Sequence, residues 1–310
     1  MSTLLTSHTH FSLLEAIGKP GALLEKAHEL WYTTVAMTDY NGMYWAVEFY
    51  KTAKQLDIKP LLWVELGFTH SLDALNELQQ PSWTITLIAK NTEGYHLLLK
   101  AVSAANMDGL RWGHPTIDVA WLRTLEKNCV WVIGAPQSWL WVALKGGDLT
   151  DQHIELVHLC DEALWQCVCT VTWRDHTESR TLKHINHSVV ACATKAWVRI
   201  CVTPNNHYID SNDRKPYEVA LWIKDWKRVF DEDRRRVRVD QALIWQNTIK
   251  KNLQNQWFDA EQIDVWIETT NSISTERSTS IDLDTILFPT YVSPEHIETL
   301  YTTHKDALIQ

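Results

Sequence analysis

Short apolar runs alternate with helical patterns along the first 210 residues, and this alternation constrains the fold more than any other feature. Six runs are predicted as strands: Thr33–Thr38, Pro60–Glu65, Thr84–Ala89, Cys129–Gly134, Gln166–Val171 and Val198–Val202. Six segments are predicted as helices: Pro20–Leu30, Ala46–Leu56, Thr92–Asn106, Val119–Glu126, Asp151–Cys160 and Glu178–Lys195. A strand–helix–strand order is typical of parallel strands. The sequence therefore predicts an α/β fold, either a closed parallel barrel or, as the alternative, an open doubly wound sheet.

Charge and hydropathy narrow the function classes. The net charge of −9 argues against a broad electrostatic grip on nucleic acid. The run Arg234–Arg236 could contact nucleic acid, but a solvated charged face is the preferred interpretation. No apolar run approaches the ~20 residues of a membrane span, and no basic segment precedes an apolar one at the N-terminus. We expect a cytoplasmic protein without a membrane segment.

The six cysteines predict no metal or disulfide framework. Most of them lie in apolar runs, and none forms a CxxC pair. Free thiols in the core are the expected outcome, rather than zinc ligands or disulfides. The sequence also contains no GxGxxG or GxxxxGK[ST] phosphate loop.

Tryptophan and glycine occur in abnormal proportions. The chain has 17 Trp and 10 Gly, whereas average usage predicts about 22 Gly at this length. Trp31 and Trp257 follow predicted helices at positions that favour glycine, and Trp226 stands where Asp-Gly would form a turn. We hypothesise that many of these residues are glycines encoded by UGA, which some bacteria decode as glycine. The alternative is a protein that is simply rich in tryptophan.

Polar residues gather at the predicted strand ends, where parallel α/β folds build active sites. Imidazoles and carboxylates that converge there suit Zn or Mn ligation and metal-assisted phosphoester hydrolysis. The alternative for any single histidine is ordinary polar surface. The set comprises His8, His10, Asp39, Glu65, His176, Asn205 and His207.

Four segments resemble the PHP (polymerase and histidinol phosphatase) domain: LLEAIGKPGALLEKAHELW, VAMTDYNGMYWAVEFYKTAKQLDIKPLLWVEL, LIAKNTEGYHLLLKAVSAA and VTPNNHYIDSND. More narrowly, they resemble the N-terminal PHP domain of bacterial DNA polymerase III alpha subunits. The resemblance implies a distorted seven-stranded parallel (β/α) barrel with metals at the strand ends and a helical C-terminal extension. Where the family has glycine, this chain has Trp31, Trp45 and Trp63.

Carried over by resemblance, the family's metal ligands are only partly present. The retained candidates are His8, Glu15, Glu65, His176 and His207, whereas Thr6, Tyr40, Thr84 and Asn205 replace family ligands. The visible pair His8 and His10 matches the family's His-x-His only with a two-residue deletion. Because each metal takes about four ligands, the resemblance implies a broken three-metal site. We expect no metal, or one weakly bound Zn or Mn ion.

The resemblance also implies a domain plan and partners. Residues 1–225 form the predicted barrel core, 226–290 its helical completion and a linker, and 291–310 the start of a linker toward a polymerase palm that is missing here. The expected function is a scaffold and interaction domain in DNA replication, carried by a fragment of the alpha subunit or a split gene product. Expected partners are the remainder of that subunit, a proofreading exonuclease, and DNA through the holoenzyme. The alternatives are a stand-alone metal-dependent PHP phosphoesterase and a docking module for the exonuclease.

Overall fold

The computed structural model describes most of the chain in one compact unit, Met1–Ser280, with Ile281–Gln310 as a second unit. The described residues are 2–74, 83–111, 113–133, 163–168, 171–172, 183–184, 186–191, 193–194, 197–237, 239–275, 279–283 and 285. The predicted helix Asp151–Cys160 and the predicted linker 291–310 lie outside them, so those expectations stay predictions. The domain boundaries proposed at 225 and 290 are likewise untested.

A mixed sheet forms the centre of the molecule, and its strand path is β1-β2-β3-β4-β7-β8-β10. These strands are β1 (Thr3–Leu4), β2 (Thr34–Met37), β3 (Lys59–Phe68), β4 (Trp83–Ala89), β7 (Cys129–Ile133), β8 (Ala163–Val168) and β10 (Arg199–Thr203). The pairs β1–β2, β2–β3, β7–β8 and β8–β10 are parallel. The predicted α/β class with a mostly parallel sheet is confirmed.

One strand departs from the predicted parallel arrangement. β4 runs antiparallel to both β3 and β7. In the β3–β4 ladder the last residue of β3, Phe68, pairs with the first residue of β4, Trp83, so β4 runs back antiparallel beside β3. A parallel return needs a crossover, usually an α-helix, and no helix was predicted between these two strands. The prediction of a purely parallel sheet is therefore wrong at β4.

Short strands extend the sheet at places that the apolar pattern missed. β6 (His114–Ile117) pairs in parallel with the end of β3 and antiparallel with β5 (Leu110–Arg111). The predicted strand Gln166–Val171 is two strands, because β8 ends at Val168 and β9 covers Val171–Thr172. β9 does not extend the central sheet; it pairs antiparallel with β11 (Val239–Asp240) in a separate two-stranded sheet.

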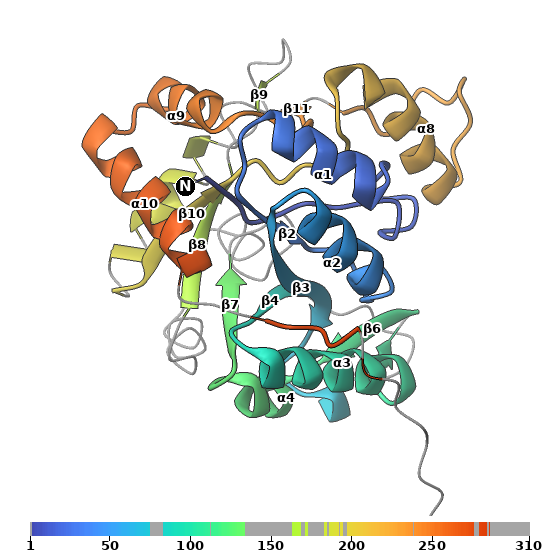
Figure 1. Cartoon of the computed structure of the whole chain (residues 1–310). Coiled ribbons are helices and arrows are strands. Elements are labelled where there is room, and N and C mark those ends of the chain that lie inside the picture. The colour runs from blue at the N-terminus through green and yellow to red at the C-terminus, as the bar shows by residue number, and fades with distance from the viewer. Residues whose placement is uncertain are drawn as a thin grey trace, which may run out of the picture. The chain divides into compact units, whose positions relative to one another are not determined.

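Helices flank the sheet close to their predicted positions. α1 (Pro20–Glu29) and α2 (Ala46–Gln55) lie side by side near β2, and α3 (Thr92–Met107) and α4 (Val119–Leu125) lie near β6 (Figure 1). Pro20 begins α1 at a position where its missing N–H does no harm. The Asn91 side chain caps the N-terminus of α3 by accepting a 2.8 Å hydrogen bond from the Gly94 N–H. The Asp118 carboxylate caps α4 in the same way, by accepting a hydrogen bond from the Trp121 N–H.

Within the described residues, three further helices follow the last strand of the sheet path. After the short 3₁₀ turn η2 (Ser211–Asp213) come α8 (Arg214–Lys224), α9 (Gln246–Asn255) and α10 (Ala260–Thr275). α10 packs on β10, and the Thr270 hydroxyl accepts a 2.9 Å hydrogen bond from the Val202 N–H. None of the described helices combines the length and apolar character that a membrane span requires.

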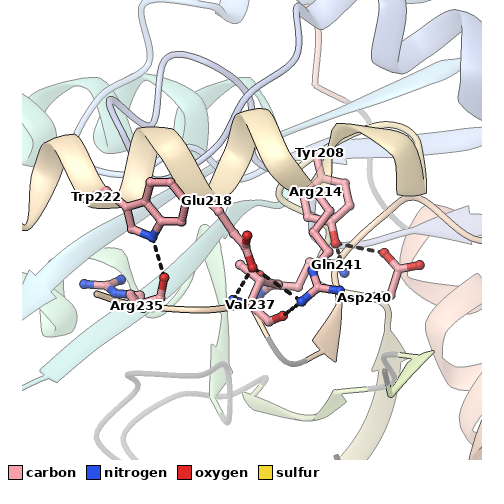
Figure 2. A network of polar contacts seen from close by, with 8 residues as sticks. All are labelled: Tyr208, Arg214, Glu218, Trp222, Arg235, Val237, Asp240 and Gln241. Carbon is pink, nitrogen blue, oxygen red and sulfur yellow. Dashed lines mark hydrogen bonds and ion pairs between the residues drawn. The ribbon is translucent and has the colours of Figure 1, made fainter. Parts of the chain in front are cut away.

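A polar network fastens α8 to the segment that leads into β11 (Figure 2). The Glu218 carboxylate accepts a 2.9 Å bond from the Val237 N–H, while Arg214 donates to the Val237 carbonyl at 2.6 Å. The Trp222 indole N–H donates to the Arg235 carbonyl at 2.5 Å. This network fixes the position of α8, whose side chains also reach the candidate site described below.

Apolar side chains from facing strands fill the interior. The cluster joins Leu5, which follows β1, to residues of β2, β3, β4, β7 and β10 and to one residue of α10. Its other members are Ala36, Leu61, Trp63, Ile88, Val130, Val132, Cys201 and Ile273. Cys129 and Cys201 are buried thiols outside any disulfide, as predicted, whereas the other four cysteines have no described side chains. The core supports the polar residues that gather at one end of the strands.

Candidate functional site

Polar residues from the first, second, third and last strands of the sheet path converge at one end of the sheet. His8 follows β1, Tyr40 follows β2, Glu65 lies in β3, and Asn205 and His207 follow β10. Isolated parallel bridges join Tyr40 to Glu65 and Ser7 to Asn206. We call this group, together with Glu15, the strand-end site. All of its members except Glu15 and Tyr40 are buried.

Aromatic rings stack at the centre of the strand-end site. The His8 ring stacks on Tyr40, with centroids 4.6 Å apart, and on His207, with centroids 4.5 Å apart. The Tyr40 and His207 centroids are 6.5 Å apart, and the Tyr217 ring of α8 lies 5.7 Å from His207. The imidazoles therefore pack as rings against rings.

Asn205 contacts both histidines, and the hydrogen bonds of this group determine their tautomers. Its amide oxygen is 3.4 Å from His8 Nε2, and its amide nitrogen is 3.3 Å from His207 Nε2. His207 Nδ1 is 2.8 Å from the Glu15 carbonyl, which only accepts, so Nδ1 must carry the proton and Nε2 must accept from Asn205. By the same reasoning His8 donates through Nε2. A single chain of hydrogen bonds thus connects Glu15, His207, Asn205 and His8.

Both imidazoles are held in the neutral form. Burial lowers the pKa of His8 well below its usual value, and the neighbouring His207 lowers it further. Burial likewise lowers the pKa of His207. Each ring needs only one N–H for the hydrogen bonds described above, so these bonds are compatible with the neutral form that burial favours.

Glu65 is a buried carboxyl group that interacts with neighbouring threonine hydroxyls of β4. The Thr84 hydroxyl donates to Glu65 Oε1 at 2.6 Å. Burial raises the pKa of Glu65 to about 8, and the nearby Glu15 adds to the increase. Glu65 is therefore mostly protonated at neutral pH. Glu15 itself forms an ion pair with Lys224 of α8.

Asp39 stabilises the loop beside the strand-end site. Its carboxylate accepts three hydrogen bonds of 2.6 Å, from the Thr9 N–H, the Thr9 hydroxyl and the Ser12 hydroxyl. Burial raises the pKa of Asp39, against the lowering effect of these donors. The carboxylate thus fixes residues 9–12 and presents no free oxygen pair to a ligand.

The structure distinguishes between the two possible histidine pairs. His10 is exposed, and its ring Nδ1 contacts the Gly18 carbonyl at 3.0 Å, outside the strand-end site. Thr6 is buried, and its hydroxyl bonds to that of Thr203. The alignment that places Thr6 and His8 at the family's His-x-His fits this geometry. His10 is not brought to the site, and His176 lies outside the described residues.

Sequence reasoning missed two contributors, both from α8. Tyr217 packs on His207, and Lys224 pairs with Glu15. Both follow His207 closely in the sequence, but no local motif marks them as site residues. Their helix is brought there by tertiary packing.

The donor set does not fit a multinuclear metal centre. Within the described part of the chain, no group of three or more His, Cys, Asp or Glu side chains is placed to hold one metal ion. Metal ligation needs neutral imidazoles with a free lone pair and ionised carboxylates. Here His207 Nε2 accepts from Asn205, and Glu65 is largely protonated. His176, the remaining candidate ligand, lies outside the described residues.

Comparisons with known proteins point to one family. The sequence pattern of the PHP domain matches residues 5–166. The DNA polymerase III subunit alpha of Buchnera aphidicola (subspecies Acyrthosiphon pisum) is 32% identical over 141 residues, covering 45% of this chain and 12% of that protein. The same subunit of Pseudomonas fluorescens is 24% identical over 296 residues, covering 94% of this chain and 24% of that protein. The chain thus spans a quarter or less of the length of these relatives.

Among solved structures, a putative metal-dependent phosphoesterase from Bifidobacterium adolescentis is similar, with a TM-score of 0.41 and 12% identity. That likeness covers 83% of this chain and 96% of the other.

Proposed function

This chain belongs to the PHP domain family, and from that premise we propose that it is the PHP domain of a DNA polymerase III alpha subunit whose metal site has been lost. In this proposal the domain acts as a scaffold in DNA replication in the cytoplasm. Its proposed partners are the remainder of such a subunit, a proofreading exonuclease, and DNA through the holoenzyme.

One observation carries the proposal: residues that replace family ligands hydrogen-bond to ligands that are retained. Thr84 donates to Glu65, and Asn205 contacts both His8 and His207. A metal ion at these atoms would have to displace those hydrogen bonds. Because buried polar groups are costly to leave unpaired, the replacements stabilise the site without a metal.

The charges support the same conclusion. A buried Glu65 with its pKa raised to about 8 offers little carboxylate at neutral pH. Glu15, the other retained carboxylate, is already paired with the Lys224 ammonium. A divalent ion would therefore meet a protonated acid at Glu65 and the Lys224 ammonium beside Glu15. We infer that the site holds no metal, or at most one Zn or Mn ion weakly.

Sheet topology supports the proposed barrel. Seven strands lie on the path from β1 to β10. The Ser7–Asn206 bridge brings together the segments that follow the first and last of them, and the His8 N–H donates to the Asn206 carbonyl at 3.0 Å. A sheet whose two ends meet in this way is consistent with the distorted seven-stranded barrel that we propose.

Metal content tests the proposal directly. The purified chain is incubated with Zn²⁺ or Mn²⁺, dialysed, and analysed by inductively coupled plasma mass spectrometry. We expect less than about one ion per chain, whereas a multinuclear site would retain several. A matched variant that combines Tyr40→His, Thr84→His and Asn205→Asp restores family ligand types and is expected to retain more metal. Several tightly held ions in the unchanged protein would overturn the proposal.

The alternative is a stand-alone phosphoesterase, favoured by the convergence of His8, Glu65 and His207 at one place. This alternative predicts Mn²⁺-dependent hydrolysis of a phosphate ester that is lost in the His207→Ala variant. The scaffold proposal predicts no activity above background in either protein. Activity that survives His207→Ala comes from a contaminant and supports neither function.

A further inference from the structure

Five helices in the described part of the chain end in the same way, with the first residue after the C-cap in the left-handed conformation. In α1 the Trp31 N–H bonds to the His28 carbonyl, and the Tyr32 N–H bonds to the Ala27 carbonyl at 3.0 Å. These two hydrogen bonds define the Schellman motif, in which glycine is the usual left-handed residue.

The same pair of hydrogen bonds occurs at four other helix ends. The left-handed residues are Asp57 after α2, Trp197 after the helical residues 193–194, Trp226 after α8, and Trp257 after α9. Their φ angles lie between 55° and 71°. Four of the five motifs thus have tryptophan where the backbone favours glycine.

A tryptophan in this conformation is strained, because its Cβ lies too close to the following carbonyl oxygen. Of the eight described non-glycine residues with positive φ, four are tryptophan and three are Asn or Asp, which tolerate this conformation. The remaining one is Leu14. A bulky aromatic residue is the type least expected at such positions.

No burial compensates for this strain. The exposed fractions of Trp31, Trp197, Trp226 and Trp257 are 79%, 95%, 94% and 82%. In the described part of the chain, the Lys183 ammonium lies over the Trp257 ring as a cation–π pair at the surface. Large aromatic rings that lie in water stabilise neither the helix end nor the core.

Other tryptophans in the same molecule behave as genuine ones. Trp222 has its indole N–H bonded to the Arg235 carbonyl (Figure 2). The Arg234 guanidinium lies 5.1 Å from the centroid of the same ring. Trp266 is buried and packs edge-on against Phe258 at 5.1 Å. Both lie within helices, at positions where their side chains have partners.

A third group is buried but has no backbone signature. Trp45, Trp63 and Trp131 are almost fully buried, and their indole N–H groups have no partner. Their φ angles are not positive. The glycine hypothesis for Trp45 and Trp63 stays a prediction that rests on the family resemblance alone.

We propose that the polypeptide made in its own cell has glycine at positions 31, 197, 226 and 257. Each of these positions combines the glycine-type backbone, the complete Schellman hydrogen bonds and an exposed ring without a packing role. The proposal goes beyond the function of the domain, because it concerns which residues the protein contains. Glycine at position 226 would also reduce the exposed apolar surface of this part of the chain, where Ile223 and Phe230 are exposed as well.

Peptide mass spectrometry of the protein isolated from its source cells tests the proposal. We expect the peptides that contain positions 31, 197, 226 and 257 to have the masses of glycine-containing sequences. Tryptophan masses at these positions would overturn the proposal. Peptides that contain Trp222 and Trp266 serve as internal controls, because we expect tryptophan there.

Thermal unfolding of recombinant variants tests the physical basis separately. Each change Trp31→Gly, Trp197→Gly or Trp226→Gly is expected to raise Tm by about 2–4 °C, and Trp257→Gly by less because it loses the contact with Lys183. The matched change Trp222→Gly is expected to lower Tm, since it removes a partnered side chain from a helix interior. A quadruple variant no more stable than its parent would contradict the proposal.

Discussion

The strand-end site and the helix C-termini both contain residues that the family pattern does not expect, but they accommodate them in opposite ways. In the strand-end site each replacement has a partner: Thr84 bonds to Glu65, and Asn205 contacts two imidazoles. At the helix ends Trp31 and Trp226 adopt a strained backbone conformation with their rings in water. The difference separates an unusual residue that the fold compensates from one that it does not.

Whether the surrounding structure accommodates an unusual residue indicates how that residue arose. The hydrogen bonds from Thr84 and Asn205 to Glu65, His8 and His207 indicate that these side chains are accommodated together in the folded protein. Uncompensated strain repeated at four similar positions indicates one common cause outside the folding of the chain. The following changes test this comparison, beginning with the largest expected effect.

Removing Asp39 should be the most damaging change. Asp39→Ala leaves three buried donors without an acceptor, namely the Thr9 N–H and the hydroxyls of Thr9 and Ser12. We expect the free energy of unfolding to fall by about 3 kcal/mol or more, measured by urea denaturation. The control Asp264→Ala removes an exposed ion pair with Lys250 and should cost less than about 1 kcal/mol. Equal losses would show that the loop beside the site is not held by Asp39.

Glu65 should make the stability depend on pH. Its native pKa of about 8 exceeds its usual value of 4.5, so between these pH values the native state binds more protons than the unfolded state. Stability from this group is fully present below pH 4.5 and is lost as pH rises toward 8. One such proton corresponds to a slope of at most about 1.4 kcal/mol per pH unit.

Glu65→Gln isolates this slope from other titrations. The variant keeps the shape of the side chain and has no proton to lose. We expect the difference in unfolding free energy between parent and variant to shift in favour of the variant as pH rises from 5 to 8. Urea denaturation at several pH values measures it. A constant difference would mean that Glu65 is ionised in the native protein. The strand-end site would then contain a buried charge that its neighbours do not compensate.

The sequence predicts the positions of the long elements well because each has a strong local pattern. α1, α2 and α3 begin at the predicted residue, and β3 extends beyond its predicted end at Glu65. β1 was missed because a strand of two residues is too short to show an alternating hydrophobic pattern. The direction of β4 depends on how the chain returns from β3, and the sequence indicates this only through the missing crossover helix.

The strand-end site was predicted in part for the same reason. His8, Glu65 and His207 follow or lie in predicted strands, and their convergence follows from the sheet. Their protonation states do not follow from spacing, because burial and the exact position of Asn205 determine them. Lys224 reaches Glu15 through the packing of α8, which no motif indicates.

Lys224 tests the edge of the strand-end site, where a smaller effect is expected. Lys224→Met removes the ion pair with Glu15 but keeps the apolar part of the side chain. Since both groups are partly exposed, we expect a loss below about 1 kcal/mol in urea denaturation. The loss should shrink further at high salt, because salt screens exposed pairs. A loss as large as that of Asp39→Ala would place the ion pair among the essential contacts of the site.

Asp57 provides the smallest and sharpest test of the helix ends. It occupies the same left-handed position after α2 that tryptophan occupies after α1 and α8, with φ of 55°. Aspartate tolerates this conformation because its short polar side chain bonds locally. Asp57→Gly should therefore increase the unfolding free energy by only a few tenths of a kcal/mol, less than Trp226→Gly in the same thermal unfolding assay. Equal gains would mean that any side chain is strained at these positions, and tryptophan would then be no special sign of a missing glycine.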